Sequence, residues 1–249
     1  MGGHIPVLLD ECIKYLNIKP DGVYVDGTLG MGGHSEAIAK LLTTGRLISI
    51  DRDAYAIERA GERLAPYADR VTIVRGNFRD LGAILDEQGV GLVDGMLFDL
   101  GVSSPQLDEG GRGFSYMVDA PLDMRMDKSD NIDAWFIVNR WPEEKIFRIL
   151  RDYGEERHAS RIAKAIAARR EEKEIKTTAE LVELIKSAMP AAALREKQHP
   201  AKRSFQAIRI AVNDELGAVS ELMENAPDRL KPGGRLAVIS FHSLEDRIV

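Results

Sequence analysis

The chain has 249 residues, of which 44% are hydrophobic and 30% are charged, with a formal net charge of −6. This length suffices for one large core, or for one core with a smaller second unit. No apolar run approaches the ~20 residues that a membrane-spanning helix needs, and the first residues lack the basic segment and long apolar run of a signal peptide. The single cysteine cannot form an internal disulfide. We therefore expect a cytoplasmic protein with no membrane partner and, from its Cys and His spacing, no metal site.

Apolar runs alternate with helix-like stretches through the first hundred residues. Strands are predicted at residues 22–26, 46–51, 71–74 and 93–100, and helices at 35–42, after a cap at Asp53, and at 77–86. Short connections between such elements are typical of a parallel sheet with right-handed crossovers, which is an α/β fold. Ligands of these sheets bind at the carboxyl ends of the strands.

The second part of the chain has a helical pattern. Helical segments are predicted from Pro142 to Gly154, over 157–170, and from a capping-box pair at Thr177 and Glu180 to Pro190. A turn at 231–234 then precedes a strand at 235–241. We therefore predict a discontinuous core formed by residues 1–106 and 214–249, with an all-helical lobe, 107–213, inserted between its strands.

The segment VDGTLGMGGHS, residues 25–35, places four glycines between the first strand and the first helix. A triphosphate-binding loop would need Lys after its last glycine, and a dinucleotide fingerprint would need Gly or Ala where Ser35 stands. S-adenosylmethionine instead needs close approach of the backbone and an acid for its ribose hydroxyls. Asp51, at the end of the second strand, can supply that acid, although an acid there would serve NAD equally well.

The fourth strand ends in the segment DLGVSSPQ, residues 99–106. Enzymes that methylate exocyclic amines carry an Asx/Ser-Pro-Pro-aromatic turn at this point. The amine is a poor nucleophile, and hydrogen-bond acceptors there orient it and stabilise its developing charge. Ser104 and Pro105 match this turn in part, whereas Gln106 stands where an aromatic is usual.

Charge is unevenly distributed along the chain. Residues 157–209 contain thirteen Lys and Arg against six Glu and no Asp, a net +7, which leaves −13 for the rest. This asymmetry is typical of a lobe that faces a polyanion, but a solvated helical surface would give the same pattern.

Several long strings together resemble one family. They are residues 4–9, 26–35, 99–108, 112–115, 121–126, 202–209 and 240–246. They are similar to the bacterial small-subunit (16S) ribosomal RNA cytosine-N4 methyltransferase family, RsmH or MraW. The resemblance implies a Rossmann-like methyltransferase core, with S-adenosylmethionine as donor. It also implies a cytidine of the decoding region as acceptor, in small-subunit rRNA within the assembled small subunit. The family pattern continues beyond residue 249 with a helix and a strand hairpin, so that hairpin is expected to be missing here.

The resemblance also implies site residues. The donor site would be formed by Gly32, Gly33, His34, Asp51, Phe78, Asp99 and Gln106. The catalytic group would be Asp99, as an orienting carboxylate, with Ser103, Ser104 and Pro105. Substrate would be bound by Arg112, Asp123, Arg125, Lys197, Lys202, Arg203 and Arg209, with residues 112–126 as a substrate gate. His4 and His242 could line the site.

Three other functions stay open from the residues alone. The basic lobe would serve equally well in an enzyme of the same class that methylates DNA or a protein amine. A fold that kept RNA binding but lost the chemistry would act as a ribosome assembly factor. A dehydrogenase is the weakest of the three, because no residues that handle a hydride are evident.

Overall fold

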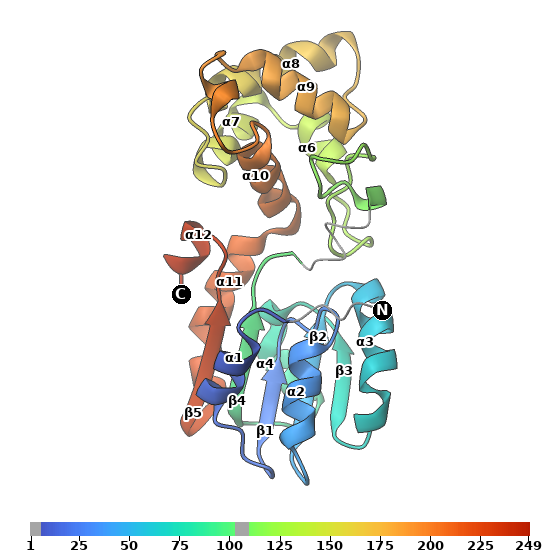
Figure 1. Cartoon of the computed structure of the whole chain (residues 1–249), viewed down its shortest axis with the longest axis vertical. Helices are drawn as coiled ribbons and strands as arrows, with labels where there is room; N and C mark the ends of the chain where they lie inside the picture. The colour runs from blue at the N-terminus through green and yellow to red at the C-terminus, as the bar shows by residue number, and fades with distance from the viewer. Residues whose placement is uncertain (1–5, 103–109) are drawn as a thin grey trace. The chain divides into compact units, whose positions relative to one another are not determined.

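The computed structural model describes residues 6–102 and 110–249 (Figure 1). The chain forms two compact units, and each is described by itself. The sheet unit contains Met1–Gly101 and Leu216–Val249, and the helical unit contains Val102–Glu215.

The sheet unit is built on five parallel strands in the order β3-β2-β1-β4-β5. The strands are β1 (Val23–Asp26), β2 (Arg46–Asp51), β3 (Val71–Arg75), β4 (Val93–Asp99) and β5 (Leu230–Ile239). The order reverses direction at β1, so a switch point lies between β1 and β4. The predicted fold class, a Rossmann-like α/β core, is confirmed.

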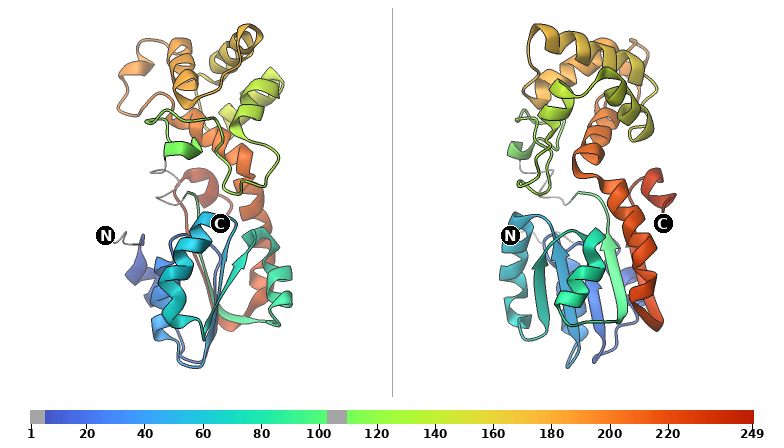
Figure 2. Two further views of the ribbon diagram at one scale, coloured as in Figure 1. Left: turned by 90° about the vertical axis from the view of Figure 1, so that its right-hand side faces the viewer. Right: turned by 180° about the vertical axis from the view of Figure 1, so that it is seen from behind.

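Helices cover both faces of this sheet, as the left view of Figure 2 shows. One face packs against α1 (Leu9–Leu16), α2 (Gly33–Leu41) and α3 (Ala54–Leu64), and the other against α4 (Leu81–Glu87) and α11 (Glu215–Asn225). Short 3-10 turns lie at Ala65–Tyr67, Phe78–Asp80 and Pro227–Arg229, and a four-residue helix, α12, at Ser243–Asp246. The central strands β1, β2 and β4 are mostly buried, which explains why they read as continuous apolar runs.

The sequence predicts that the last strand begins after a turn at 231–234. This start is wrong, because residues 231–234 lie inside β5. Val93 pairs with Leu230 and Gly95 with Arg235, so the intervening residues of β5 bulge opposite Asp94. Lys231 bonds the Asp94 carboxylate at 2.7 Å. Gly233 has φ +79°, a conformation that glycine adopts without strain.

The helical unit has its own apolar core. Its helices are α6 (Ala134–Arg140), α7 (Glu143–Asp152), α8 (Ala159–Glu172), α9 (Thr178–Ala188) and α10 (Lys202–Asn213), with 3-10 turns at Gly110–Arg112 and Ala193–Arg195. Side chains such as Ile162, Ile185 and Ile208 are fully buried in this core. The predicted capping box is confirmed, with Thr177 and Glu180 each accepting the other's backbone N–H at 3.3 Å. Among the described helices of either unit, none is long and apolar enough to cross a membrane.

Candidate donor-binding and catalytic site

Three aspartates end three neighbouring strands of the sheet. Asp26 ends β1, Asp51 ends β2 and Asp99 ends β4, and β1 pairs with both of the other strands. The strands are parallel, so the three carboxyl groups lie at the same edge, next to the switch point of the sheet.

The glycine-rich loop folds over Asp51. The N–H of Gly30 donates to one oxygen of the Asp51 carboxylate at 2.8 Å, and the N–H of Asp53 donates to the other at 2.9 Å. Gly32 has φ +76°, and a Cβ there would lie 3.1 Å from the Cβ of Ala60. Glycine thus allows the loop to turn against α3 and leaves backbone, rather than side chains, facing the edge of the sheet.

Burial raises the pKa of Asp51 to about 6, and the N–H groups of Asp53 and Gly30 partly offset that effect. Burial also raises the pKa of Asp26, against the stabilising hydroxyl of Ser35, which donates to it at 2.6 Å. A carboxylate with a raised pKa gains from any ligand that supplies further hydrogen-bond donors.

Asp99 is positioned by its neighbours on β1 and the glycine loop. Its N–H donates to Oγ1 of Thr28 at 2.6 Å, and the N–H of Thr28 donates to Asp26 at 3.2 Å. These two hydrogen bonds, from Thr28 to Asp26 and from Asp99 to Thr28, therefore connect the loop to the end of β4. Sequence reasoning assigned no role to Thr28 or Asp26, because this contact depends on which strands are adjacent.

His34 lies between the N-terminal segment and Asp99. Its Nε2 is 3.0 Å from the carbonyl oxygen of Val7, and its Nδ1 is 3.8 Å from Oδ2 of Asp99. A carbonyl oxygen only accepts, so Nε2 carries the hydrogen and Nδ1 faces the carboxylate. His34 is thus a buried contact of Asp99, next to the loop glycines Gly32 and Gly33.

Phe78 follows β3 and packs edge-on against the buried ring of Phe98, with ring centroids 5.8 Å apart. Half-buried at the margin of the core, it keeps part of its surface accessible, so its assignment to the adenine stays a prediction. The predicted residues Ser103, Ser104, Pro105, Gln106 and His4 lie outside the described residues. His242 caps α12, its Nδ1 accepting the N–H of Glu245 at 3.4 Å.

Three predicted substrate residues are engaged inside the helical unit. Arg112 is buried and donates to the carbonyl oxygens of Arg125 and Met126 at 2.9 and 3.0 Å. Arg125 pairs with Asp123 at 2.7 Å. Because Asn213 also bonds the N–H of Met126 at 2.8 Å, these contacts favour a fixed segment over the substrate gate expected at residues 112–126.

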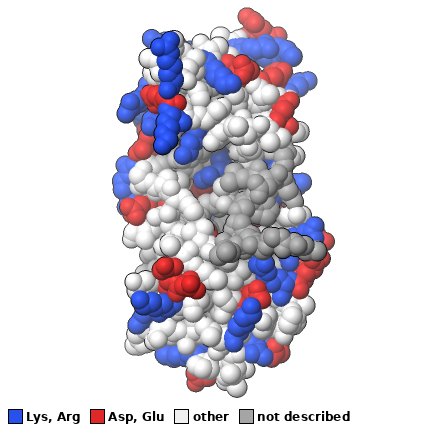
Figure 3. Space-filling view, in the orientation of Figure 1, with Lys and Arg blue, Asp and Glu red and all other residues white. Residues whose placement is uncertain are grey.

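The other predicted substrate residues differ in whether their charged groups already bond other residues. Arg209 forms two bonds of 2.8 Å with the buried Glu215, and Arg203 donates to the carbonyl oxygen of Glu155 at 2.9 Å. Lys197 and Lys202 are exposed, and within the described part of the chain neither ammonium has an ion-pair partner. On the face that Figure 3 shows, Lys and Arg side chains of the helical unit are interspersed with carboxylates.

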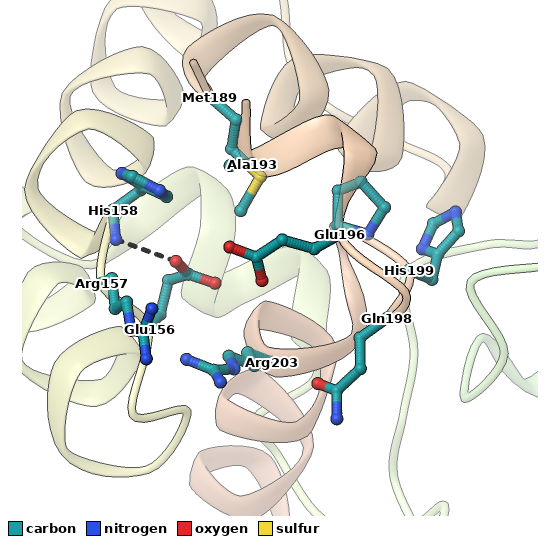
Figure 4. Close-up of a pocket in the computed structure, with 10 residues that line it drawn as sticks. Glu156, Arg157, His158, Met189, Ala193, Glu196, Gln198, His199 and Arg203 are labelled. Carbon is teal, nitrogen blue, oxygen red and sulfur yellow. Dashed lines mark hydrogen bonds between the residues drawn. The ribbon is translucent and has the colours of Figure 1, made fainter. Parts of the chain in front are cut away.

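A pocket lies wholly within the helical unit (Figure 4). Its lining includes Glu156, His158, Glu196, His199 and Arg203. Figure 4 shows the carboxylates of Glu156 and Glu196 facing the same space as Arg203. This mixed charge does not resemble a phosphate site, which would have a uniformly basic lining. In neither unit do the described residues include a cluster of His, Cys, Asp or Glu that could hold a metal ion.

Several known proteins are similar to the chain in sequence or in structure. The model of the MraW methylase family matches residues 1–249. Proteins named ribosomal RNA small subunit methyltransferase H are similar to the chain: that of Symbiobacterium thermophilum is 57% identical, covering 99% of this chain and 78% of its own length, and that of Brevibacillus brevis is 58% identical, covering 98% and 78%. A solved putative rRNA-methylase from Clostridium thermocellum is 24% identical over 41% of this chain and 55% of its own, with a TM-score of 0.35.

Proposed function

The chain belongs to the MraW methylase family, and from that premise we propose that it transfers a methyl group from S-adenosylmethionine to the N4 amine of a cytidine in small-subunit ribosomal RNA. The observation that carries this proposal is the identity of 57% to a small-subunit ribosomal RNA methyltransferase along 99% of the chain. The geometry at the carboxyl edge of the sheet supports it.

S-adenosylmethionine supplies an electrophilic methyl group on a sulfonium. Asp51 accepts the ribose hydroxyls, because its carboxylate already stands at the loop with two N–H groups holding it in place. The loop from Gly30 to Gly33 presents backbone to the methionine part, and Phe78 is an apolar wall for the adenine. Gln106 completes the donor site.

Asp99 orients the acceptor amine. The lone pair of a cytosine N4 is delocalised into the ring, so it must be turned toward the methyl group. Asp99 accepts the amine hydrogens, with Ser103, Ser104 and Pro105 providing further acceptors. As the N–CH3 bond forms and the S–CH3 bond breaks, the nitrogen becomes cationic and its proton leaves to water.

The proposed role of the helical unit is to bind the RNA. Lys197 and Lys202 are the best phosphate contacts because they are exposed and no described residue forms an ion pair with them. Arg203 follows, since one bond to a carbonyl oxygen leaves its other donors available. Arg112 and Arg209 support this surface from within. The substrate in this scheme is the assembled small subunit, and the protein acts in the cytoplasm.

The test offers S-adenosylmethionine with a labelled methyl group and a panel of acceptors: naked small-subunit RNA, assembled small subunits, duplex DNA and ribosomal protein. We expect label in the ribosomal RNA alone. Label in DNA or protein would replace the acceptor with another of the same chemical class. Donor binding without any transfer would favour an assembly factor.

A further inference from the structure

An aromatic side chain stands exposed next to the proposed active site. Phe241 lies two residues after the end of β5 and is 57% exposed, although Phe is usually buried. A Cβ added to Gly101 would lie 3.6 Å from Cδ2 of Phe241. Gly101 is two residues beyond Asp99, so the ring flanks the chain as it leaves the active-site strand.

Strand pairing fixes this position. Asp99 is the register partner of Ile239, and the N–H of Leu100 donates to the carbonyl oxygen of Ile239 at 3.0 Å. β4 and β5 therefore end together at the carboxyl edge. Phe241 emerges from the second of these strands at the level where Asp99 ends the first.

A buried carboxylate holds the backbone of Phe241 in place. The N–H of Phe241 donates to Oε2 of Glu245 at 2.8 Å, and Glu245 is only 1% exposed. Nε2 of His242 lies 3.2 Å from Oε1 of the same carboxylate. The turn after β5 is thus built around an internal polar contact that holds the backbone of Phe241, while its side chain stays exposed.

We propose that Phe241 is the surface on which the target cytosine stacks when it enters the site; this inference rests on the proposed function. A base must leave its stack before its amine can reach a methyl donor, and a flat ring replaces the lost stacking. Asp99 then meets the amine while Phe241 meets the face of the same base. The two contacts use different parts of the cytosine, so they can act together.

Three substitutions test the role of the ring. Phe241→Leu keeps an apolar side chain but removes the flat surface, and we expect kcat/KM for the RNA to fall about tenfold or more. Phe241→Tyr keeps the ring and should stay within about twofold of wild type. Tyr15→Leu is the matched control: Tyr15 is 60% exposed on α1, and its carbonyl oxygen accepts from Arg235, which pairs with Gly95 toward the opposite end of β4.

Donor affinity, measured by calorimetry in each variant, separates the outcomes. The proposal requires unchanged donor affinity in Phe241→Leu, which also shows that the variant is folded. A Phe241→Leu enzyme with wild-type kcat/KM would overturn it, because any apolar contact would then suffice. So would weakened donor binding in both Phe241 variants. If the wild-type protein methylates no RNA, the proposed function itself fails, and that result is distinct from both.

Discussion

Asp51 shows how one side chain can make donor binding depend on pH. Its carboxylate is held by two backbone N–H groups, yet burial raises its pKa to about 6. The ionised form accepts from both ribose hydroxyls more strongly than the protonated form, which has lost its charge and uses one oxygen as an O–H donor. As pH falls through about 6, the ionised fraction of Asp51 declines and the binding site for the ribose is lost.

We therefore expect the affinity for S-adenosylmethionine to be about tenfold lower at pH 5 than at pH 8. Titration calorimetry across this range measures it. Asp51→Asn should bind more weakly at every pH and lose most of this dependence. A pH dependence in Asp51→Asn equal to that of wild type would assign the titration to another group.

At the scale of elements, the strands were the most predictable part of the fold. The second strand was predicted at residues 46–51 and is found there, because a buried parallel strand is a continuous apolar run. The predicted start of the last strand was wrong, since a Pro-Gly-Gly sequence is typical of a turn and only its pairing with β4 makes it a bulge. Helix α6, with seven residues, was too short to give a periodic pattern.

The connection from β1 to α2 provides an element-scale prediction. A Cβ on Gly27 would lie 2.0 Å from Cε1 of Phe98, which is fully buried, so Gly27→Ala must displace that ring. We expect the free energy of unfolding of the sheet unit to fall by about 1–3 kcal/mol. Hydrogen exchange of the β1 and β4 amides measures this change within the full chain.

Gly61→Ala is the control for that substitution. Gly61 lies inside α3, and a Cβ there would have nothing within 4 Å. Alanine should therefore stabilise the helix by about 0.5–1 kcal/mol. If Gly27→Ala exchanged its β1 amides as slowly as wild type, the close packing of Gly27 on Phe98 would not be a constraint on the fold.

At the scale of the whole molecule, the chain forms two units with separate cores, and the proposed function assigns donor binding to one and RNA binding to the other. The acidic sheet unit contains the aspartates of the proposed donor site, and the basic residues 157–209 belong to the helical unit. The sequence placed Asp51 and the glycine loop at strand ends, which is where ligands of such sheets bind, and the family resemblance implied Asp99; their roles stay predictions. It could not predict the Thr28–Asp99 bond, which joins residues far apart in the chain, or the pairing of Arg209 with Glu215, which depends on how α10 meets α11.

The central claim is that this edge of the sheet methylates a cytidine of ribosomal RNA with Asp99 orienting the amine. The measurement that tests it most directly is a single turnover on assembled small subunits with labelled S-adenosylmethionine at saturation, followed by digestion of their RNA to nucleosides, for wild type and Asp99→Ala. We predict label in N4-methylcytidine with wild type, and a rate at least about a hundredfold lower with Asp99→Ala. An equal rate in Asp99→Ala, or label in any other nucleoside, would contradict the account.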